Sequence, residues 1–125
     1  MFLVGGFTTG GKERQLTTLI MHLPKDKYEV HLLMKYRESY YFDLVESELT
    51  SFYDFDKPRF SLLDIIKVRK ILNIIGPDVV FSFSTTLSHI ILFINFFGSY
   101  YYRLINGSIR DAPTRLNINK IFEML

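Results

Sequence analysis

The sequence predicts a single α/β domain with a Rossmann-like fold, a three-layer sandwich in which helices cover both faces of a mainly parallel sheet. Three observations favour this fold. Apolar or β-rich segments alternate along the chain with segments whose apolar residues recur at helical spacing. Residues 78–83 (DVVFSF) show little polar alternation, as expected for a central parallel strand that is buried on both faces. Residues 5–14 (GGFTTGGKER) follow the first apolar run, where such folds have a strand-to-helix turn.

The first strand and the first helix are predicted on either side of this glycine-rich turn. Residues 1–4 form the apolar strand, and the helix is indicated by apolar residues at helical spacing, namely Leu16, Leu19, Ile20 and Leu23. Glycine lets a ligand approach the backbone closely, and the free amides and dipole of a helix N-terminus favour an anion. The turn is therefore a candidate phosphate-binding site. The alternative is that its glycines only allow the first helix to pack on the sheet.

The remaining elements follow from the same periodicities and from their turn residues. Gly76 and Pro77 end one predicted helix, and Gly98 closes the next. In chain order we predict a turn at residues 24–27, a strand at 28–34, a helix at 38–49, a short strand at 51–55, a helix at 60–75, a strand at 78–83, a helix at 84–97, a strand at 99–105, a polar loop at 106–114 and the start of a helix at 115–125.

Five strand-helix units in series imply right-handed crossovers and the strand order 3-2-1-4-5. With that order, a ligand binds at the carboxyl ends of strands 1 and 4. The glycine-rich turn, residues 84–86 and residues 106–110 are therefore expected along one rim. Residues 1–125 are predicted to form one domain. Because the pattern stops inside a helix, without a capping signal, we expect more protein to follow.

Composition argues against several classes of site. The chain has no cysteine, so a disulfide framework or thiolate metal site is excluded. His22, His31 and His89 lack metal-ligand spacing, and Asp54-Phe55-Asp56 has no neighbouring ligand, so no metal site is predicted. A formal net charge of +2, spread along the chain, gives no support for nucleic acid as a partner.

The lack of a secretory signal in the sequence predicts a cytoplasmic location. Glycine and polar residues begin at position 5, which is incompatible with the apolar region of a secretory signal. The most apolar stretch, residues 90–97, is much shorter than the roughly 20 residues of a spanning helix. Lys67, Arg69 and Lys70 place three cations on one predicted helix. We interpret them as a solvated helix face, with peripheral contact at the inner face of a membrane as the alternative.

Known phosphate-binding motifs fit the glycine-rich turn only in part. Gly6, Gly11 and Lys12 have the spacing of a P-loop, but Glu13 stands where a serine or threonine binds magnesium. The spacing GxGxxG is absent, and no acidic residue ends the second strand to bind a ribose. The sequence therefore argues against a P-loop NTPase and against NAD binding.

Three segments together resemble a known family. They are residues 10–14 (GGKER), residues 27–32 (KYEVHL) and residues 77–83 (PDVVFSF), in this order and spacing. They are similar to the start of the first helix, the second strand and the fourth strand in the N-terminal half of GT-B glycosyltransferases of family 4. The resemblance covers the whole chain. Each motif is weak alone, and the order and spacing give the resemblance its specificity.

The resemblance implies a retaining transferase that moves a sugar from a nucleotide-sugar donor to a glycan or lipid-linked acceptor. Most of the nucleotide would be bound by a C-terminal domain of the same protein, which these residues lack. The fragment alone should therefore be inactive. No cofactor is implied, because the nucleoside-diphosphate sugar is a substrate. Gly10 and Gly11 would face the donor diphosphate.

The other candidate residues each have a structural alternative. Glu13 and Arg14 either contact substrate or form an ion pair in the first helical turn. Arg110 either pairs with a phosphate or tethers Asp111. Asn106 can bond a sugar hydroxyl but cannot transfer a proton. Ser84, Thr85 and Thr86 either contact substrate or cap a helix. The candidate substrate-binding set is Glu13, Arg14, Ser84, Thr85, Asn106, Ser108 and Arg110, and no catalytic residue is identified.

Two other classes of function stay open. The chain could be a nucleotide- or phosphate-binding module that transfers no sugar, such as a NAD-independent epimerase or a phosphate sensor. It could also be a flavodoxin-like interaction domain, although the acidic cluster expected at the first turn of such a domain is absent. Titration with nucleoside diphosphates and UDP-sugars separates these classes.

Overall fold

Strands and helices alternate along the residues that the computed structural model describes, which are 1–7, 10–37, 39–57 and 59–107. The predicted loop at residues 108–114 and the predicted helix at 115–125 lie outside them. The elements are β1 (Phe2–Phe7), α1 (Gly11–His22), β2 (His31–Arg37), α2 (Ser39–Val45), a 3₁₀ turn (Glu46–Glu48), β3 (Ser51–Asp54), α3 (Leu62–Ile75), β4 (Val80–Ser82), α4 (Thr85–Phe97) and β5 (Leu104–Asn106).

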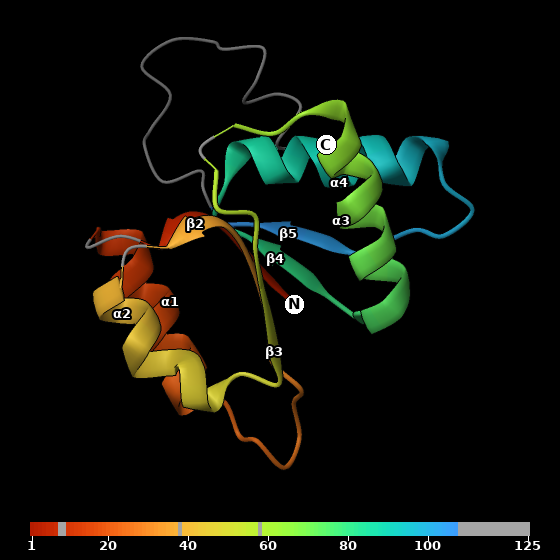
Figure 1. Cartoon of the computed structure of the whole chain (residues 1–125). Helices are drawn as coiled ribbons and strands as arrows, with labels where there is room; N and C mark the ends of the chain where they lie inside the picture. The colour runs from red at the N-terminus through yellow and green to blue at the C-terminus, as the bar shows by residue number, and fades with distance from the viewer. Residues whose placement is uncertain (8–9, 38, 58, 108–125) are drawn as a thin grey trace, which may run out of the picture.

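The five strands form one parallel sheet in the order β3-β2-β1-β4-β5 (Figure 1). The predicted α/β class, parallel sheet and strand order are therefore confirmed. In register, Leu3 of β1 lies between Leu33 of β2 and Ser82 of β4. Because all strands run the same way, their carboxyl ends meet at one edge of the sheet.

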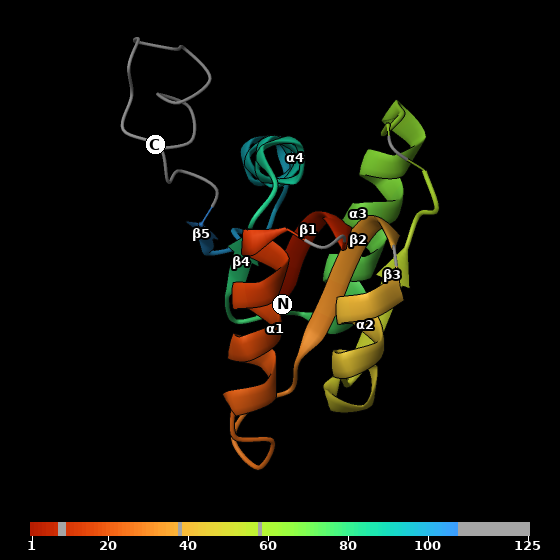
Figure 2. The ribbon, with the colours of Figure 1, turned by 90° about the vertical axis from the view of Figure 1, so that its left-hand side faces the viewer.

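Helices cover both faces of the sheet, with α1 and α2 on one side and α3 and α4 on the other (Figures 1 and 2). Alternate residues of β1 supply both cores. Phe2 and Val4 pack in the core with α1 and α2, whereas Leu3 packs in the core with α3 and α4. This two-sided burial explains why the strands lack polar alternation.

Two predicted boundaries at the start of the chain are wrong. β1 continues past Val4 to Phe7, because Gly6 pairs with Tyr36 of β2 and Phe7 is fully buried in edge-to-face contact with Phe42. Seven of the ten residues of the predicted turn at 5–14 are therefore strand or helix. β2 begins at His31 rather than at residue 28, since the amide of Tyr28 still donates to the carbonyl of Pro24 in the preceding turn.

The later strands are shorter than predicted. β4 contains only Val80–Ser82, and β5 only Leu104–Asn106. Residues 99–103 are not strand because the side chain of Asn95 bonds both the amide and the carbonyl of Tyr102, at 2.8 and 2.9 Å. The predicted helix at 38–49 is divided into α2 and the 3₁₀ turn.

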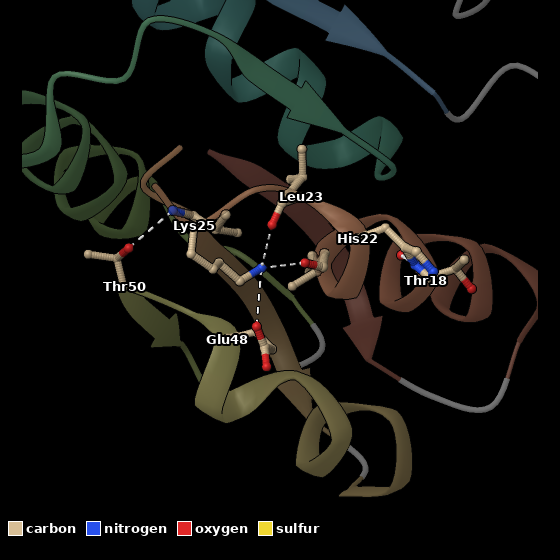
Figure 3. A network of polar contacts seen from close by, with 8 residues as sticks. Thr18, His22, Leu23, Lys25, Glu48 and Thr50 are labelled. Atoms are coloured by element: carbon tan, nitrogen blue, oxygen red, sulfur yellow. Dashed lines mark hydrogen bonds and ion pairs between the residues drawn. The ribbon is translucent and has the colours of Figure 1, made fainter. Parts of the chain in front are cut away.

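Helix ends agree with the sequence signals at Gly76 and at Ser84. Gly76 ends α3 in the left-handed conformation at φ 58°, which glycine adopts without strain. Ser84 caps α4, as its hydroxyl accepts a hydrogen bond from the amide of Leu87. Lys25 donates to the carbonyls of Ile20 and Leu23 at the end of α1, and its ammonium lies 3.3 Å from Glu48 (Figure 3). This lysine links the end of α1 to the 3₁₀ turn after α2.

The first turn of α3 contains a buried carboxylate that forms an ion pair with a partly exposed lysine of the preceding segment. Asp64 is fully buried, accepts hydrogen bonds from the amide and hydroxyl of Ser61, and lies 2.7 Å from the ammonium of Lys57. Burial by itself would raise the pKa of this carboxyl. The hydrogen bonds from Lys57 and Ser61 outweigh burial and lower the pKa to about 2.

We expect Asp64→Asn to lower the free energy of unfolding by about 1–2 kcal/mol at neutral pH, because it removes the ion pair and weakens the cap. A lowered pKa stabilises the fold above the unfolded value of 3.8, and this contribution is lost as the pH falls towards 2. Denaturant unfolding of both proteins should therefore converge over that range. The exposed Asp43→Asn is the control, and a difference that stays constant with pH would contradict the assignment.

Candidate functional site

The carboxyl edge of the sheet brings together most of the described candidate residues. The register pairs Leu3 with Ser82 and Ser82 with Asn106, so β4 and β5 end side by side next to β1, which continues to Phe7. A Cβ added to Gly5 would lie 3.6 Å from the Ser84 hydroxyl, an ordinary contact that shows how close the two turns are. The single rim predicted from the strand order is thus present for the described residues. Ser108 and Arg110 lie outside them.

The N-terminus of α1 has a bare backbone. Gly10 is the N-cap in an extended conformation, and no side chain caps the helix there. Gly11 is the first helical residue, and a Cβ at this position would meet nothing within 4 Å. Amides that no side chain caps, at the positive end of a helix dipole, are what an anion requires. The geometry is therefore compatible with phosphate binding at Gly10 and Gly11.

The carboxylate of Glu13 lies against this helix N-terminus. A Cβ added to Gly10 would overlap Oε2 of Glu13, so the side chain folds back over the N-cap. A negative charge in the first turn stabilises a helix through its dipole. Glu13 therefore occupies the region that a bound phosphate would enter. Arg14 is exposed, and in the described part of the chain its guanidinium forms no ion pair with Glu13, so the predicted alternative of an ion pair between the two is not observed.

Tyr36 is a residue of this edge that the sequence analysis missed. Its ring covers Gly6, where an added Cβ would lie 2.6 Å from the ring and 2.7 Å from the phenolic oxygen. The glycine is thus required for the ring to pack across the strand pair. A glycine inside a predicted strand, opposite an aromatic residue of the next strand, is the signal that could have identified the contact.

Ser84 belongs to a buried hydroxyl cluster between β4 and α4. The hydroxyl of Ser82 donates to the carbonyl of Ser84 at 2.9 Å, and that of Ser88 lies 2.8 Å from the Ser82 oxygen. All three serines are buried. These bonds satisfy polar groups where the chain turns from strand to helix. The capping role of Ser84 is therefore confirmed.

Thr85 differs from these serines because its side chain is exposed in the first turn of α4, as is Thr86. Asn106 is half-buried at the end of β5, next to Ser82 in register. Gly107 follows it, and the rings of Phe81 and Phe83 leave no room there for a side chain. Thr85 and Asn106 therefore remain placed to contact a ligand at this edge.

The other polar residues that were considered as candidates from the sequence lie away from this edge. Lys67 and Lys70 line a hollow of about 540 Å³ beside β3, whereas Arg69 lies towards α4. Asp54 accepts a hydrogen bond from the amide of Asp56 and lies 3.9 Å from Arg37, which places it in a local turn. Among the described residues, no three metal-binding side chains come together. In the same part of the chain, every helix is too short or too polar to cross a membrane.

Comparisons of the chain with protein-family models, with curated proteins and with solved structures found no match. The structure itself defines the class of protein, which is a Rossmann-like, parallel α/β fold with strand order 3-2-1-4-5.

We expect Ser88→Ala to lower the free energy of unfolding by about 1–2 kcal/mol, because it removes a hydroxyl from the buried cluster. Thr85→Ala should change it by less than about 0.5 kcal/mol, since that side chain is exposed. Urea unfolding of the two variants tests this. Equal effects would show that the buried cluster does not stabilise the β4–α4 turn.

Proposed function

We propose that this chain is the N-terminal, acceptor-side half of a retaining glycosyltransferase that uses a nucleoside-diphosphate sugar. The supporting observation is the helix N-terminus at Gly10 and Gly11, which has no side-chain hydrogen bond to cap it and lies where the strand order reverses between β1 and β4. Ligands of doubly wound folds bind at this point. The resemblance of residues 10–14, 27–32 and 77–83 to family 4 of the GT-B enzymes specifies the kind of ligand.

The geometry supports a contribution of this half to diphosphate binding, but only a partial one. The amides of Gly10 and Gly11 can donate to a phosphate oxygen, and the helix dipole favours its charge. The carboxylate of Glu13 opposes a second negative charge in the same place. Neutralisation of the leaving diphosphate would therefore depend on cationic groups of a C-terminal domain in the same protein.

The acceptor, a glycan or a lipid-linked sugar, would bind along the rest of this edge. Two polar residues lie there, Thr85 at the start of α4 and Asn106 at the end of β5. Hydroxyl and amide groups can orient a sugar by hydrogen bonds without transferring a proton. The role proposed for this half is thus to position the acceptor beside the donor diphosphate.

The first test is donor affinity. We expect the 125-residue chain to bind UDP-sugars or GDP-sugars with a Kd above about 1 mM, because a few amide contacts supply only about 4 kcal/mol or less. Isothermal titration calorimetry measures this directly. Micromolar binding of a nucleotide sugar would contradict the division between two domains. Micromolar binding of nucleoside diphosphates alone would favour the alternative, a nucleotide-binding module that transfers no sugar.

The second test concerns Glu13. We expect Glu13→Gln to strengthen binding of inorganic pyrophosphate about threefold, because it removes a like charge from the helix N-terminus. Glu46→Gln removes the same charge from an exposed position of the 3₁₀ turn and is the control. Competition titrations at low salt give the ratio of affinities. Weaker pyrophosphate binding by Glu13→Gln would show that Glu13 assists the ligand instead of opposing it.

A further inference from the structure

β3 lies at one edge of the sheet and pairs with β2 alone among the described residues (Figure 2). An edge strand leaves a row of backbone amides and carbonyls without a neighbouring strand. Asp54 is exposed although only 20% of its side chain is exposed, so its main chain contributes much of the exposed area. β3 is thus open to the addition of a further strand.

A hollow of about 540 Å³ lies beside this open strand. Residues 52–55 line it on the strand side, and Lys67, Lys70 and Ile71 of α3 line it at helical spacing. Side chains of a strand alternate between the two faces of the sheet, so a hollow that touches four consecutive residues follows the edge of the strand. The hollow therefore has the position that an added strand would occupy.

Positive charge exceeds negative charge along the hollow. Three lysines line it, Lys57, Lys67 and Lys70, together with one carboxylate, that of Asp54. The Asp54 carboxylate lies 3.9 Å from the guanidinium of Arg37, which offsets its charge. The residues that line the hollow therefore do not balance the three lysines.

The acidic residues behind the hollow balance only part of this charge. Asp64 is buried and lies 2.7 Å from the ammonium of Lys57 and 3.9 Å from that of Lys67, so one carboxylate serves two cations. Asp56 lies in the turn after β3 and does not line the hollow. Lys70 forms no ion pair within the part of the chain that the structure describes. The exposed Lys67 and Lys70 thus provide an excess of positive charge beside the open strand.

We propose that the open edge of β3 binds an extended acidic peptide segment of a partner protein as an added strand. The main chain of the peptide bonds the free amides and carbonyls of β3, and its carboxylates face Lys67 and Lys70. A second copy of this edge would bring like charges together. A small anion would pair with the lysines but would leave the backbone edge unpaired.

Binding at this edge leaves the candidate site at Gly10 and Gly11 free. β2 separates β3 from β1 in the sheet, and the two glycines follow β1. The peptide site is therefore independent of the proposed sugar transfer, and failure of either one leaves the other unchanged.

Labelled synthetic peptides of about eight residues, a common strand length, test this site. One peptide alternates glutamate and valine, a second has proline in place of each valine, and a third has lysine in place of each glutamate. Fluorescence anisotropy should show that the glutamate–valine peptide binds at low salt. The other two should bind about tenfold more weakly or less, because proline removes backbone donors and lysine reverses the charge.

Charge variants test the contribution of α3. Lys67→Gln with Lys70→Gln should weaken binding of the glutamate–valine peptide about fivefold and reduce its salt dependence, because two exposed ion pairs are lost. Lys27→Gln with Arg69→Gln is the matched control, since it removes the same charge from exposed positions that do not line the hollow. The control should change the affinity by less than about twofold.

Hydrogen exchange locates the bound peptide. The amides of residues 51–54 should exchange more slowly in the complex, because an added strand protects the edge of β3. Circular dichroism checks that each variant is folded.

Three outcomes overturn the proposal. The first is no binding of the glutamate–valine peptide. The second is equal binding of the proline peptide, or an equal loss in the two double variants, either of which would reduce the interaction to unspecific charge attraction. The third is a dimer in sedimentation, without peptide, in which the amides of residues 51–54 are protected. That result would identify the occupant of the edge as a second copy of the chain.

Discussion

The whole structure depends on the burial of β1 on both faces. Phe2 and Val4 are packed under α1 and α2, while Leu3, between them, is packed under α3 and α4. A strand with this alternation needs a helix layer on each side, and parallel neighbours on each edge require crossovers on both faces. The same arrangement brings the ends of β4 and β5 next to β1, which continues beyond them to Phe7. It therefore fixes where the N-terminus of α1 and the start of α4 emerge, which is the edge at which we propose that phosphate and sugar bind.

Two kinds of interaction at that edge affect ligand binding by this chain. One holds the backbone of the edge in place, and the other weakens the binding of an anion. The serine cluster and the contact of Tyr36 with Gly6 hold the backbone in place, so the edge is formed before any ligand arrives. The carboxylate of Glu13 already interacts with the positive end of the dipole of α1, which leaves only part of that positive potential for a ligand. A second domain that adds cations would complete such a site.

Sequence periodicity was enough to predict the class, the parallel sheet and its order, because hydrophobic burial decides these features. It predicted helix ends well at Ser84 and Gly76, where a local signal dominates. It failed at strand ends, which tertiary contacts decide: Tyr36 and Phe42 extend β1 through Gly6 and Phe7, and Asn95 holds Tyr102 out of β5.

Within the candidate site, sequence signals found the glycines and the cap but could not show that Glu13 folds over Gly10. The exposure of Phe96 was equally hidden, since an apolar residue on an apolar helix gives no indication of which side faces the solvent.

We propose that the N-terminus of α1, at Gly10 and Gly11, is the anion-binding point of this fold. The most direct measurement is a nuclear magnetic resonance titration of the ¹⁵N-labelled chain with inorganic pyrophosphate. The account predicts that the amide signals of Gly10 and Gly11 move first and furthest, with smaller shifts at Thr85. Shifts concentrated instead at the amino edge of the sheet, around the hollow lined by Lys27, His31 and Asp78, would contradict it.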